Sequence, residues 1–345
     1  MSPVRWGMLG AGWISRQAIA PAMHDTKNAQ LYAVAARSAQ RAAALRPAGP
    51  VYTEYQSILD DPDVDAVYIA LDNGGHEEWI TRALGAGKPV LCEKPLTMHS
   101  GTTERVMNHA EALGVPLVEA VWNLWHPRTQ RLLELLRQGA IEDITSIRGT
   151  FAFNGVPEDN YRLDPDRGGG SMLDVGCYPL TAAAAALSAT TSLPETLVDM
   201  ALSVANIERE KSANGVDLRT VALLDIAGVS MSVESSFIDI PHQFFVVTGT
   251  GGAISLDQES FTSYKQQSTL TWIPNQANGV PIIESFAPVD AYSLMIRNVG
   301  SSFRAWRDGT DESQDTGHPS AWLPDPAWSR WTAGVMSALR SRETA

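Results

Sequence analysis

The feature that most constrains the fold is an alternation of two hydrophobic periods through the first third of this 345-residue chain. Short apolar or β-branched runs, typical of buried strands, occupy residues 4–9, 31–36, 66–71, 89–92 and 116–119. Segments with helical spacing lie between them, at 14–23, 38–45, 76–86 and 102–113. Strands that alternate with helices predict a parallel, doubly wound sheet covered on both faces.

From about residue 145 the pattern changes to strands that follow one another, at 146–154, 198–207, 218–226, 229–240, 243–248 and 253–257. Within 229–240, Met231, Val233 and Phe237 alternate with serines, as expected for a sheet with one buried face. Turn residues separate several of these strands, so the sheet is predicted to be antiparallel. Two closing helices are expected at 292–306 and 326–340, separated by an acidic, polar loop at 308–319.

Length and composition limit the classes of function. A chain of this length is expected to form about two domains. The formal net charge of −13 and a pI near 5.0 argue against nucleic acid as a partner. Cys92 and Cys177 are too few for a disulfide framework, and no apolar run reaches the about 20 residues of a membrane span. No export signal is recognisable, so we expect a cytoplasmic protein that does not engage a membrane.

A glycine pair marks the turn between the first strand and the first helix. Gly10 would allow a tight turn, and Gly12 would let a pyrophosphate approach the unpaired N–H groups of the helix. Ser15 replaces the third glycine of the usual fingerprint. Turns of this kind also close ordinary strand–helix units, but the position at the start of a βαβ unit favours dinucleotide binding.

The end of the second strand bears on which dinucleotide is bound. An Asp or Glu there commonly accepts hydrogen bonds from the ribose of NAD, whereas an Arg accommodates the 2′-phosphate of NADP. This chain has Arg37, followed by Ser38 and Arg41, and no carboxylate at that strand end. The arginines favour NADP, although surface positions at the start of a helix would explain them as well.

Two further clusters carry chemically useful side chains. Lys94 follows the strand at 89–92 and therefore lies at the carboxyl edge of the parallel sheet, where such folds bind ligands. A run of three glycines at 168–170 precedes a helix on which Asp174 and Tyr178, four residues apart, share a face. Taken alone, Lys94 would more often be a solvated surface residue, and the helix would as often carry an acidic residue at its N-terminus and a packed tyrosine.

Taken together, these motifs resemble the glucose-fructose oxidoreductase, inositol dehydrogenase and rhizopine catabolism family (Gfo/Idh/MocA). The match rests on the glycine loop, on 67–70 with Asn73 and His76, on the 86–95 segment ending Glu93-Lys94-Pro95, on Glu119-Ala120 with His126-Pro127, and on the glycine-rich Asp174 motif. The resemblance implies a Rossmann domain over residues 1–122. It implies a second domain over 123–345, with an open, mostly antiparallel sheet and closing C-terminal helices, and a site for nicotinamide and substrate between the two.

The family also implies roles for individual residues. Tyr178 stands where the inositol dehydrogenase branch has a histidine, so the chain is most similar to the glucose-fructose oxidoreductase, xylose dehydrogenase and dihydrodiol dehydrogenase branch, which generally prefers NADP; NAD stays possible. The Lys94–Pro95 bond is expected to be cis. Asp72 departs from the family pattern and would either favour a substrate hydroxyl or repel an acidic substrate. The cofactor-binding residues are expected to be Gly10, Ala11, Gly12, Trp13, Ile14, Arg37, Ser38, Arg41, Leu71, Asn73, His76, Glu93 and Lys94.

The expected reaction is hydride transfer between NADP and a secondary alcohol or anomeric carbon of a sugar, polyol or similar substrate, in either direction. Tyr178 is expected to act as acid and base, Lys94 to stabilise its phenolate, and Asp174 to orient a substrate hydroxyl; Lys94 as the proton acceptor is the alternative. The substrate-binding residues are expected to be Lys94, Trp122, Arg162, Asp174 and Tyr178.

Two rival functions come from the same family, namely a catalytically silent dinucleotide sensor and an NAD-dependent, redox-assisted glycoside hydrolase. No metal site is expected, because no His or Cys pair has ligand spacing. The family also implies a homodimer or homotetramer that associates through the outer face of the antiparallel sheet.

Overall fold

The computed structural model describes residues 2–190, 197–257, 259–275, 279–310 and 322–342. The chain forms two compact units. The first contains Met1–Thr97, Gly101–Trp122 and Asp290–Asp325, and the second contains Met98–Ser100, Asn123–Val289 and Pro326–Ala345. This division differs from a single boundary after residue 122, because the segment around helix α8 (Ala291–Asp308) packs on the first unit.

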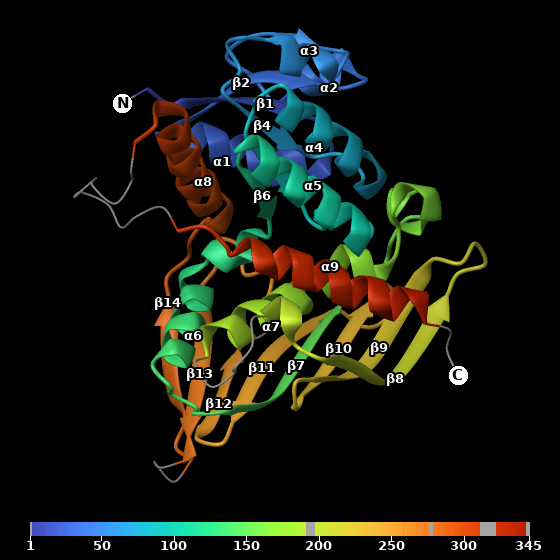
Figure 1. Cartoon of the computed structure of the whole chain (residues 1–345), viewed down its shortest axis with the longest axis vertical. Coiled ribbons are helices and arrows are strands. Elements are labelled where there is room, and N and C mark those ends of the chain that lie inside the picture. Colours follow the sequence, from blue (N-terminus) through green and yellow to red (C-terminus); the bar gives the residue numbers. More distant parts are fainter. Residues whose placement is uncertain (1, 191–196, 258, 276–278, 311–321, 343–345) are drawn as a thin grey trace. The chain divides into compact units, whose positions relative to one another are not determined.

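The first unit is built on a six-stranded sheet whose strands all run parallel (Figure 1), as the alternating periods predict. The strand order is β3-β2-β1-β4-β5-β6, so the direction of winding reverses between β1 and β4. Open α/β sheets of this order bind ligands at the carboxyl ends of the strands beside that reversal. The strands are β1 (Val4–Leu9), β2 (Ala29–Ala35), β3 (Val51–Tyr52), β4 (Ala66–Ile69), β5 (Val90–Glu93) and β6 (Leu117–Ala120).

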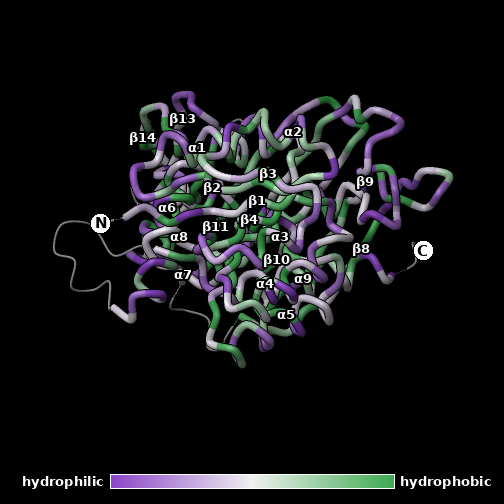
Figure 2. The backbone as a smooth tube through the Cα atoms, turned by 90° about the horizontal axis from the view of Figure 1, so that it is seen from above, coloured by the Kyte–Doolittle hydropathy of each residue, from purple (hydrophilic) through white to green (hydrophobic). Residues whose placement is uncertain are grey.

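Helices connect these strands, and hydrophilic residues gather in the outer loops (Figure 2). The helices are a π-helical turn at Ser15–Ile19 that continues into α1 (Ala20–Asp25), then α2 (Ala39–Ala43), α3 (Gln56–Asp60), α4 (His76–Gly85) and α5 (Ser100–Leu113). The sequence pattern missed β3 and α3, because two and five residues are too few to show a hydrophobic period. In α8, Met295, Ile296, Val299 and Phe303 form the buried stripe that docks on this unit.

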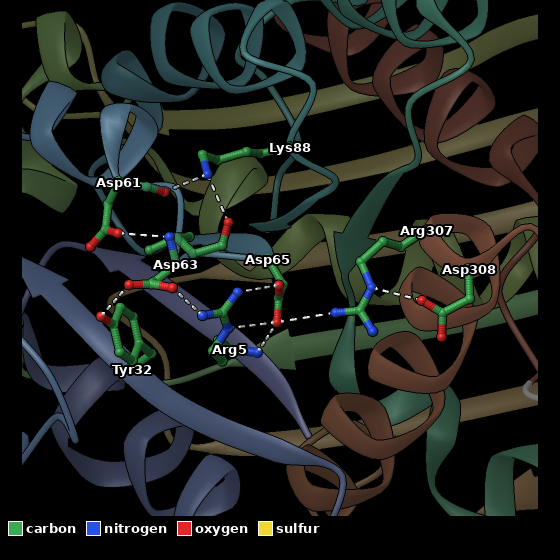
Figure 3. A network of polar contacts seen from close by, with 9 residues as sticks. Arg5, Tyr32, Asp61, Asp63, Asp65, Lys88, Arg307 and Asp308 are labelled. Carbon is green, nitrogen blue, oxygen red and sulfur yellow. Dashed lines mark hydrogen bonds and ion pairs between the residues drawn. The ribbon is translucent and has the colours of Figure 1, made fainter. Parts of the chain in front are cut away.

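The amino ends of the strands are closed by a polar network (Figure 3). Arg5 pairs with Asp63 at 2.5 Å and with Asp65 at 3.1 Å, and Arg307 of α8 reaches Asp65 at 3.2 Å. The ammonium of Lys88 donates to the carbonyl oxygens of residues 61 and 64 at 2.8 and 2.7 Å. Burial raises the pKa of Asp65, but the hydrogen bonds from Arg5 outweigh it and the pKa is lowered overall. This network lies at the edge opposite the carboxyl ends of the strands, where open α/β sheets bind ligands.

The second unit contains an eight-stranded sheet in the order β14-β13-β12-β11-β7-β10-β9-β8. Only β7 and β10 pair in parallel, so the sheet is mostly antiparallel, as predicted. Its strands are β7 (Ile144–Ala152), β8 (Leu202–Lys211), β9 (Asp217–Ile226), β10 (Val229–Ser236), β11 (His242–Gly249), β12 (Gly252–Leu256), β13 (Ser268–Pro274) and β14 (Ile282–Phe286).

Three helices lie on one face of this sheet: α6 (Pro127–Arg137), α7 (Cys177–Ala189) and α9 (Pro326–Ser341) (Figure 1). Every residue of α7 up to Leu187 is buried, which makes it the central helix of the unit. One helical stretch in the described part of the chain, Pro165–Ala189, is long and apolar enough to cross a membrane, a match that the sequence analysis did not anticipate. Its apolar window is 94% buried inside the protein, as a core helix would be.

Some boundaries differ from the predicted ones for identifiable reasons. The strand predicted at 229–240 ends at Ser236, because the hydroxyl of Ser236 accepts the N–H groups of Ile238 and Asp239 and turns the chain. Helix α6 and strands β13 and β14 were not predicted. The loop predicted at 308–319 lies mostly outside the described residues.

Candidate active site

The glycine loop follows β1 at the reversal of the strand order. Gly10 has a φ of +101°, and a Cβ there would lie 2.3 Å from the carbonyl oxygen of Ala70, so only glycine fits. Gly12 is exposed, and a Cβ there would meet no protein atom within 4 Å. Gly10 is therefore needed for the fold, whereas Gly12 keeps a space open outside the protein.

Ser15 fixes this loop in place of the third glycine. Its buried hydroxyl donates to the carbonyl oxygen of Gly10 at 3.1 Å. The helical conformation begins at Trp13, whose side chain is 69% exposed. The amides of a first helical turn lack intrahelical partners and favour an anion, so the loop is suited to a pyrophosphate.

The end of β2 presents the arginines that the sequence analysis selected. Arg37 and Arg41 are both exposed, and the side chain of Ser38 accepts the N–H of Arg41 at 3.3 Å as the cap of α2. Tyr55 lies within electrostatic reach of both arginines. Burial is the largest influence on its phenol and raises the pKa overall, Asp72 raises it further, and the charges of Arg37 and Arg41 lower it in part. The structure thus gathers two cations around one end of the sheet edge.

Sequence reasoning missed Tyr55, which packs edge-on against Trp79 with ring centroids 5.1 Å apart. Both rings rest on the core of the first unit. The guanidinium of Arg82 covers the face of Trp79 at 5.1 Å. An aromatic residue just after the weakly patterned β3 was the only signal in the sequence.

Lys94 follows β5 directly and is half-buried. Side chains from both sides hold this segment: Tyr68 of β4 donates to Glu93 at 2.6 Å, and Glu119 of β6 accepts the N–H of Leu96 at 2.8 Å. The Lys94–Pro95 peptide bond is cis, as the family resemblance implies. The position of Lys94 at the carboxyl edge is therefore defined by buried polar contacts.

His76 clamps the same segment. Its Nδ1 lies 3.0 Å from the carbonyl oxygen of Pro95 and its Nε2 lies 3.3 Å from that of Leu71. Burial lowers the pKa of His76, and the side chain is fully buried. Asn73 and Glu93 are also buried. These three positions support the loops, and their direct contact with a cofactor stays a prediction.

In the second unit, Arg162 and Asp174 form an ion pair. The Nε of Arg162 donates to Oδ2 of Asp174 at 2.6 Å, and the guanidinium lies 5.1 Å from the centre of the Tyr161 ring. Burial opposes the charge of Arg162, but Asp174 outweighs it and raises the arginine pKa. Asp174, which was expected to orient a substrate hydroxyl, also holds the guanidinium of Arg162, and its contact with substrate stays a prediction.

Tyr178 lies one helical turn after Asp174, as the four-residue spacing predicts. Its ring is 6% exposed and lies 5.4 Å from Phe151 and 6.1 Å from Phe261, measured between centroids. The ring of Tyr178 is therefore held in place by packing against two other aromatic rings.

Trp122, expected to bind substrate, belongs to the first unit, where it is 4% exposed and stacks on Tyr292 at 4.5 Å. Its contact with substrate stays a prediction, and the geometry shows a packing role. In the described part of the chain, no group of three or more His, Cys, Asp or Glu residues could hold a metal ion.

The reversal point with its glycine loop, and a fixed lysine on the same sheet edge, define a protein of the dinucleotide-binding Rossmann class. Comparison with protein families is more specific. Residues 4–120 match the oxidoreductase family with an NAD-binding Rossmann fold, GFO/IDH/MocA, and residues 129–255 match the GFO/IDH/MocA C-terminal domain. The chain belongs to this family, which confirms the resemblance and the expected class of NAD(P)-dependent oxidoreductase.

Individual relatives cover most of the chain. D-xylose 1-dehydrogenase (NADP(+)) 2 of Haloferax volcanii is 33% identical over 83% of this chain and 85% of its own length. A dTDP-3,4-didehydro-2,6-dideoxy-alpha-D-glucose 3-reductase of Saccharopolyspora spinosa is 32% identical over 74% and 75%. The crystal structure of KijD10, a 3-ketoreductase from Actinomadura kijaniata in complex with NADP and TDP-benzene, superposes with a TM-score of 0.80 at 27% identity, covering 99% and 98%.

Proposed function

We propose that this oxidoreductase transfers hydride between NADP and a secondary alcohol, or the anomeric carbon, of a sugar, polyol or similar small molecule. The observation that carries the proposal is the fixed position of Lys94 on the sheet edge that also bears the open Gly12 loop. The loop suits a pyrophosphate, and the lysine supplies a hydrogen-bond donor where ligands of this fold bind. Relatives named for reactions on xylose and on dTDP-linked keto sugars support the substrate class.

The preference for NADP rests on the charges at the end of β2. The exposed guanidinium groups of Arg37 and Arg41 match the 2′-phosphate, and Ser38 between them supplies a hydroxyl. The xylose dehydrogenase is named for NADP and the similar 3-ketoreductase was crystallised with it. When bound, the dinucleotide supplies the carbon that accepts or donates the hydride. NAD stays possible as a weaker cofactor, since the loop at Gly10–Gly12 serves either.

The proton that accompanies the hydride needs a residue of the chain. We assign it to the phenol of Tyr178, with the ammonium of Lys94 stabilising the phenolate and donating to the substrate oxygen. The ion pair of Asp174 with Arg162 would orient the remaining hydroxyls of the substrate. Proton acceptance by Lys94 itself is the alternative assignment.

The test is a screen at 340 nm with NADP⁺ and NAD⁺ against pentoses, hexoses, inositols and dihydrodiols. Wild-type protein should reduce NADP⁺ with at least one of these substrates, and Tyr178→Phe, the matched control, should lose most of kcat. Absence of any reduction above this control, with NADPH still bound, would indicate a dinucleotide sensor. Release of a sugar from a glycoside without net reduction would indicate the hydrolase instead.

The same family suggests a homodimer or homotetramer formed through the outer face of the antiparallel sheet. Leu223, Phe244, Ile273 and Ile283 share that face by strand register and are 45%, 36%, 37% and 63% exposed. Exposed apolar side chains on one sheet face are typical of an interface. Light scattering should show an oligomer that Phe244→Asp dissociates. A cytoplasmic location is likewise proposed, since both cysteines are buried thiols, as is usual in a reducing compartment.

A further inference from the structure

The start of the helix that carries Asp174 and Tyr178 is held by a carboxylate from a distant strand. Asp217, the first residue of β9, is 7% exposed. Its Oδ2 accepts the backbone N–H of Met172 at 2.8 Å and the hydroxyl of Ser171 at 2.9 Å. Amides in the first turn of a helix lack intrahelical partners, so this carboxylate satisfies one of them and faces the positive end of the helix dipole.

A second contact ties the same point to the neighbouring strand. The hydroxyl oxygen of Ser171 lies 3.0 Å from that of Ser235 in β10, and both serines are fully buried. A hydroxyl has one hydrogen to donate. When Asp217 is ionised it only accepts, so the Ser171 hydroxyl donates to it at 2.9 Å in preference to the carbonyl oxygen of Ser235 at 3.3 Å, and accepts from the Ser235 hydroxyl. The chain of bonds therefore has a fixed direction and joins the helix to β9 and β10.

Glycines on both sides of Ser171 and Met172 allow the backbone to pack closely against its neighbours. Gly170 has a φ of +121°, and a Cβ there would lie 2.2 Å from Oδ1 of Asp217. A Cβ on Gly176 would lie 2.5 Å from the sulfur of Met172 and 3.3 Å from Cβ of Ser235. The backbone is thus pressed against the carboxylate and against β10, so the helix start has little freedom to shift while these contacts hold.

The negative charge of Asp217 also interacts with the positive charge of Arg340 in helix α9. Burial raises the pKa of Asp217, whereas the hydrogen bonds from Met172 and Ser171 and the positive charge of Arg340 in α9 lower it, and the net direction is upward. Burial in turn lowers the pKa of Arg340. A buried carboxylate is costly unless it is hydrogen-bonded, so its hydrogen bonds with Met172 and Ser171 are needed to keep it charged in this position.

We propose that Asp217 is a positioning residue of the active site, which acts through Ser171 and Met172 to set the placement of Asp174 and Tyr178. The proposal rests on the proposed function, because those two residues are assigned to the reaction there. Asp217 lies outside every motif that the sequence analysis selected. A misplacement of about 1 Å in reacting groups can cost about 100-fold in rate.

The experiment compares Asp217→Asn, Asp217→Ala and Ser171→Ala with wild type, below the Tm of every variant. Asp257→Asn is the matched control, because Asp257 is a partly buried carboxylate in the same unit that pairs with Arg128 and accepts the hydroxyl of Thr269 at 3.0 Å. Asp217→Ala should lower kcat about 10- to 100-fold with NADPH affinity unchanged, and Asp217→Asn should lose less. The double variant of Ser171 and Asp217 should be no slower than Asp217→Ala.

Hydrogen exchange over residues 171–178 provides a readout that needs no substrate. Exchange there should rise in Asp217→Asn and not in Asp257→Asn. If exchange rises in Asp217→Asn while the wild-type protein turns over no substrate, the proposed function fails, but the role of Asp217 in holding the start of the helix is supported. Wild-type kcat in folded Asp217→Ala, or equal losses in Asp217→Asn and Asp257→Asn, would overturn the positioning role. Should Asp217→Ala not fold, Asp217→Asn and Ser171→Ala decide by the same criteria.

Discussion

The two glycines of the phosphate loop should respond to the same substitution in opposite ways. A methyl group at Gly10 would stand 2.3 Å from a backbone oxygen at a positive φ, whereas one at Gly12 would stand in open space. Gly10→Ala should therefore damage the fold, and Gly12→Ala should damage cofactor binding alone.

The magnitudes follow from the contacts. At Gly10 an L residue at positive φ costs about 1–2 kcal/mol and the backbone shift about 1–3 kcal/mol more, so unfolding should become easier by about 2–5 kcal/mol. Gly12→Ala should change the free energy of unfolding by no more than about 1 kcal/mol, towards greater stability. Loss of one charge-assisted hydrogen bond to the pyrophosphate, about 1.5–3 kcal/mol, should raise the Kd for NADPH about 10- to 150-fold.

Urea denaturation and NADPH fluorescence titration measure the two quantities separately. Gly85→Ala is the control, because Gly85 also faces open space but lies at the end of α4. A folded Gly12→Ala protein that binds NADPH as wild type does would refute the assignment of this loop to the pyrophosphate. Wild-type stability in Gly10→Ala would refute the steric argument.

Three further outcomes are expected. Arg37→Gln should raise the Kd for NADPH about 10- to 150-fold and leave that for NADH unchanged; equal effects on both would place Arg37 away from the 2′-phosphate. Tyr178→Phe should lower kcat by about 10²- to 10⁴-fold without altering NADPH affinity, and near-normal turnover would remove Tyr178 from the proton transfer. Burial lowers the pKa of His126 to about 4, so the stability it contributes is present above pH 6.5 and lost as the pH falls towards 4. Between pH 7 and pH 5, urea denaturation should show wild type losing about 2 kcal/mol more than His126→Asn, and parallel curves would contradict this.

Periodicity predicted the sheets well because it reports which faces are buried. The alternation of strand and helix correctly predicted that the strands of the first unit run parallel. The glycine pair after the first strand lies at the point where the strand order reverses. The hydrophobic periodicity did not predict β3 and α6, for different reasons. The former is too short to show a period, and the latter begins at Pro127 with His126 as its N-cap, a pair that was interpreted only as part of the family motif.

The candidate site was predictable only where a motif carries it. Lys94 and the pair Asp174 and Tyr178 stand in recognisable patterns, and their local geometry agrees with the expected elements. Asp217 comes from a strand far along the chain from Ser171, and Tyr55 from the segment after β3, and nothing in their local sequence points to Ser171 or to Arg37. Such contacts depend on tertiary packing, which a single sequence does not reveal.

The most direct test of the central claim follows one hydrogen atom. A sugar identified by the screen would be labelled with deuterium at the carbon to be oxidised and mixed with NADP⁺ and a stoichiometric amount of wild-type protein. The account predicts that the deuterium appears on the reduced dinucleotide, in equal amount to the oxidised sugar, and that Tyr178→Phe slows its appearance. Oxidised sugar without label on the cofactor, or label lost to water, would contradict hydride transfer by this protein.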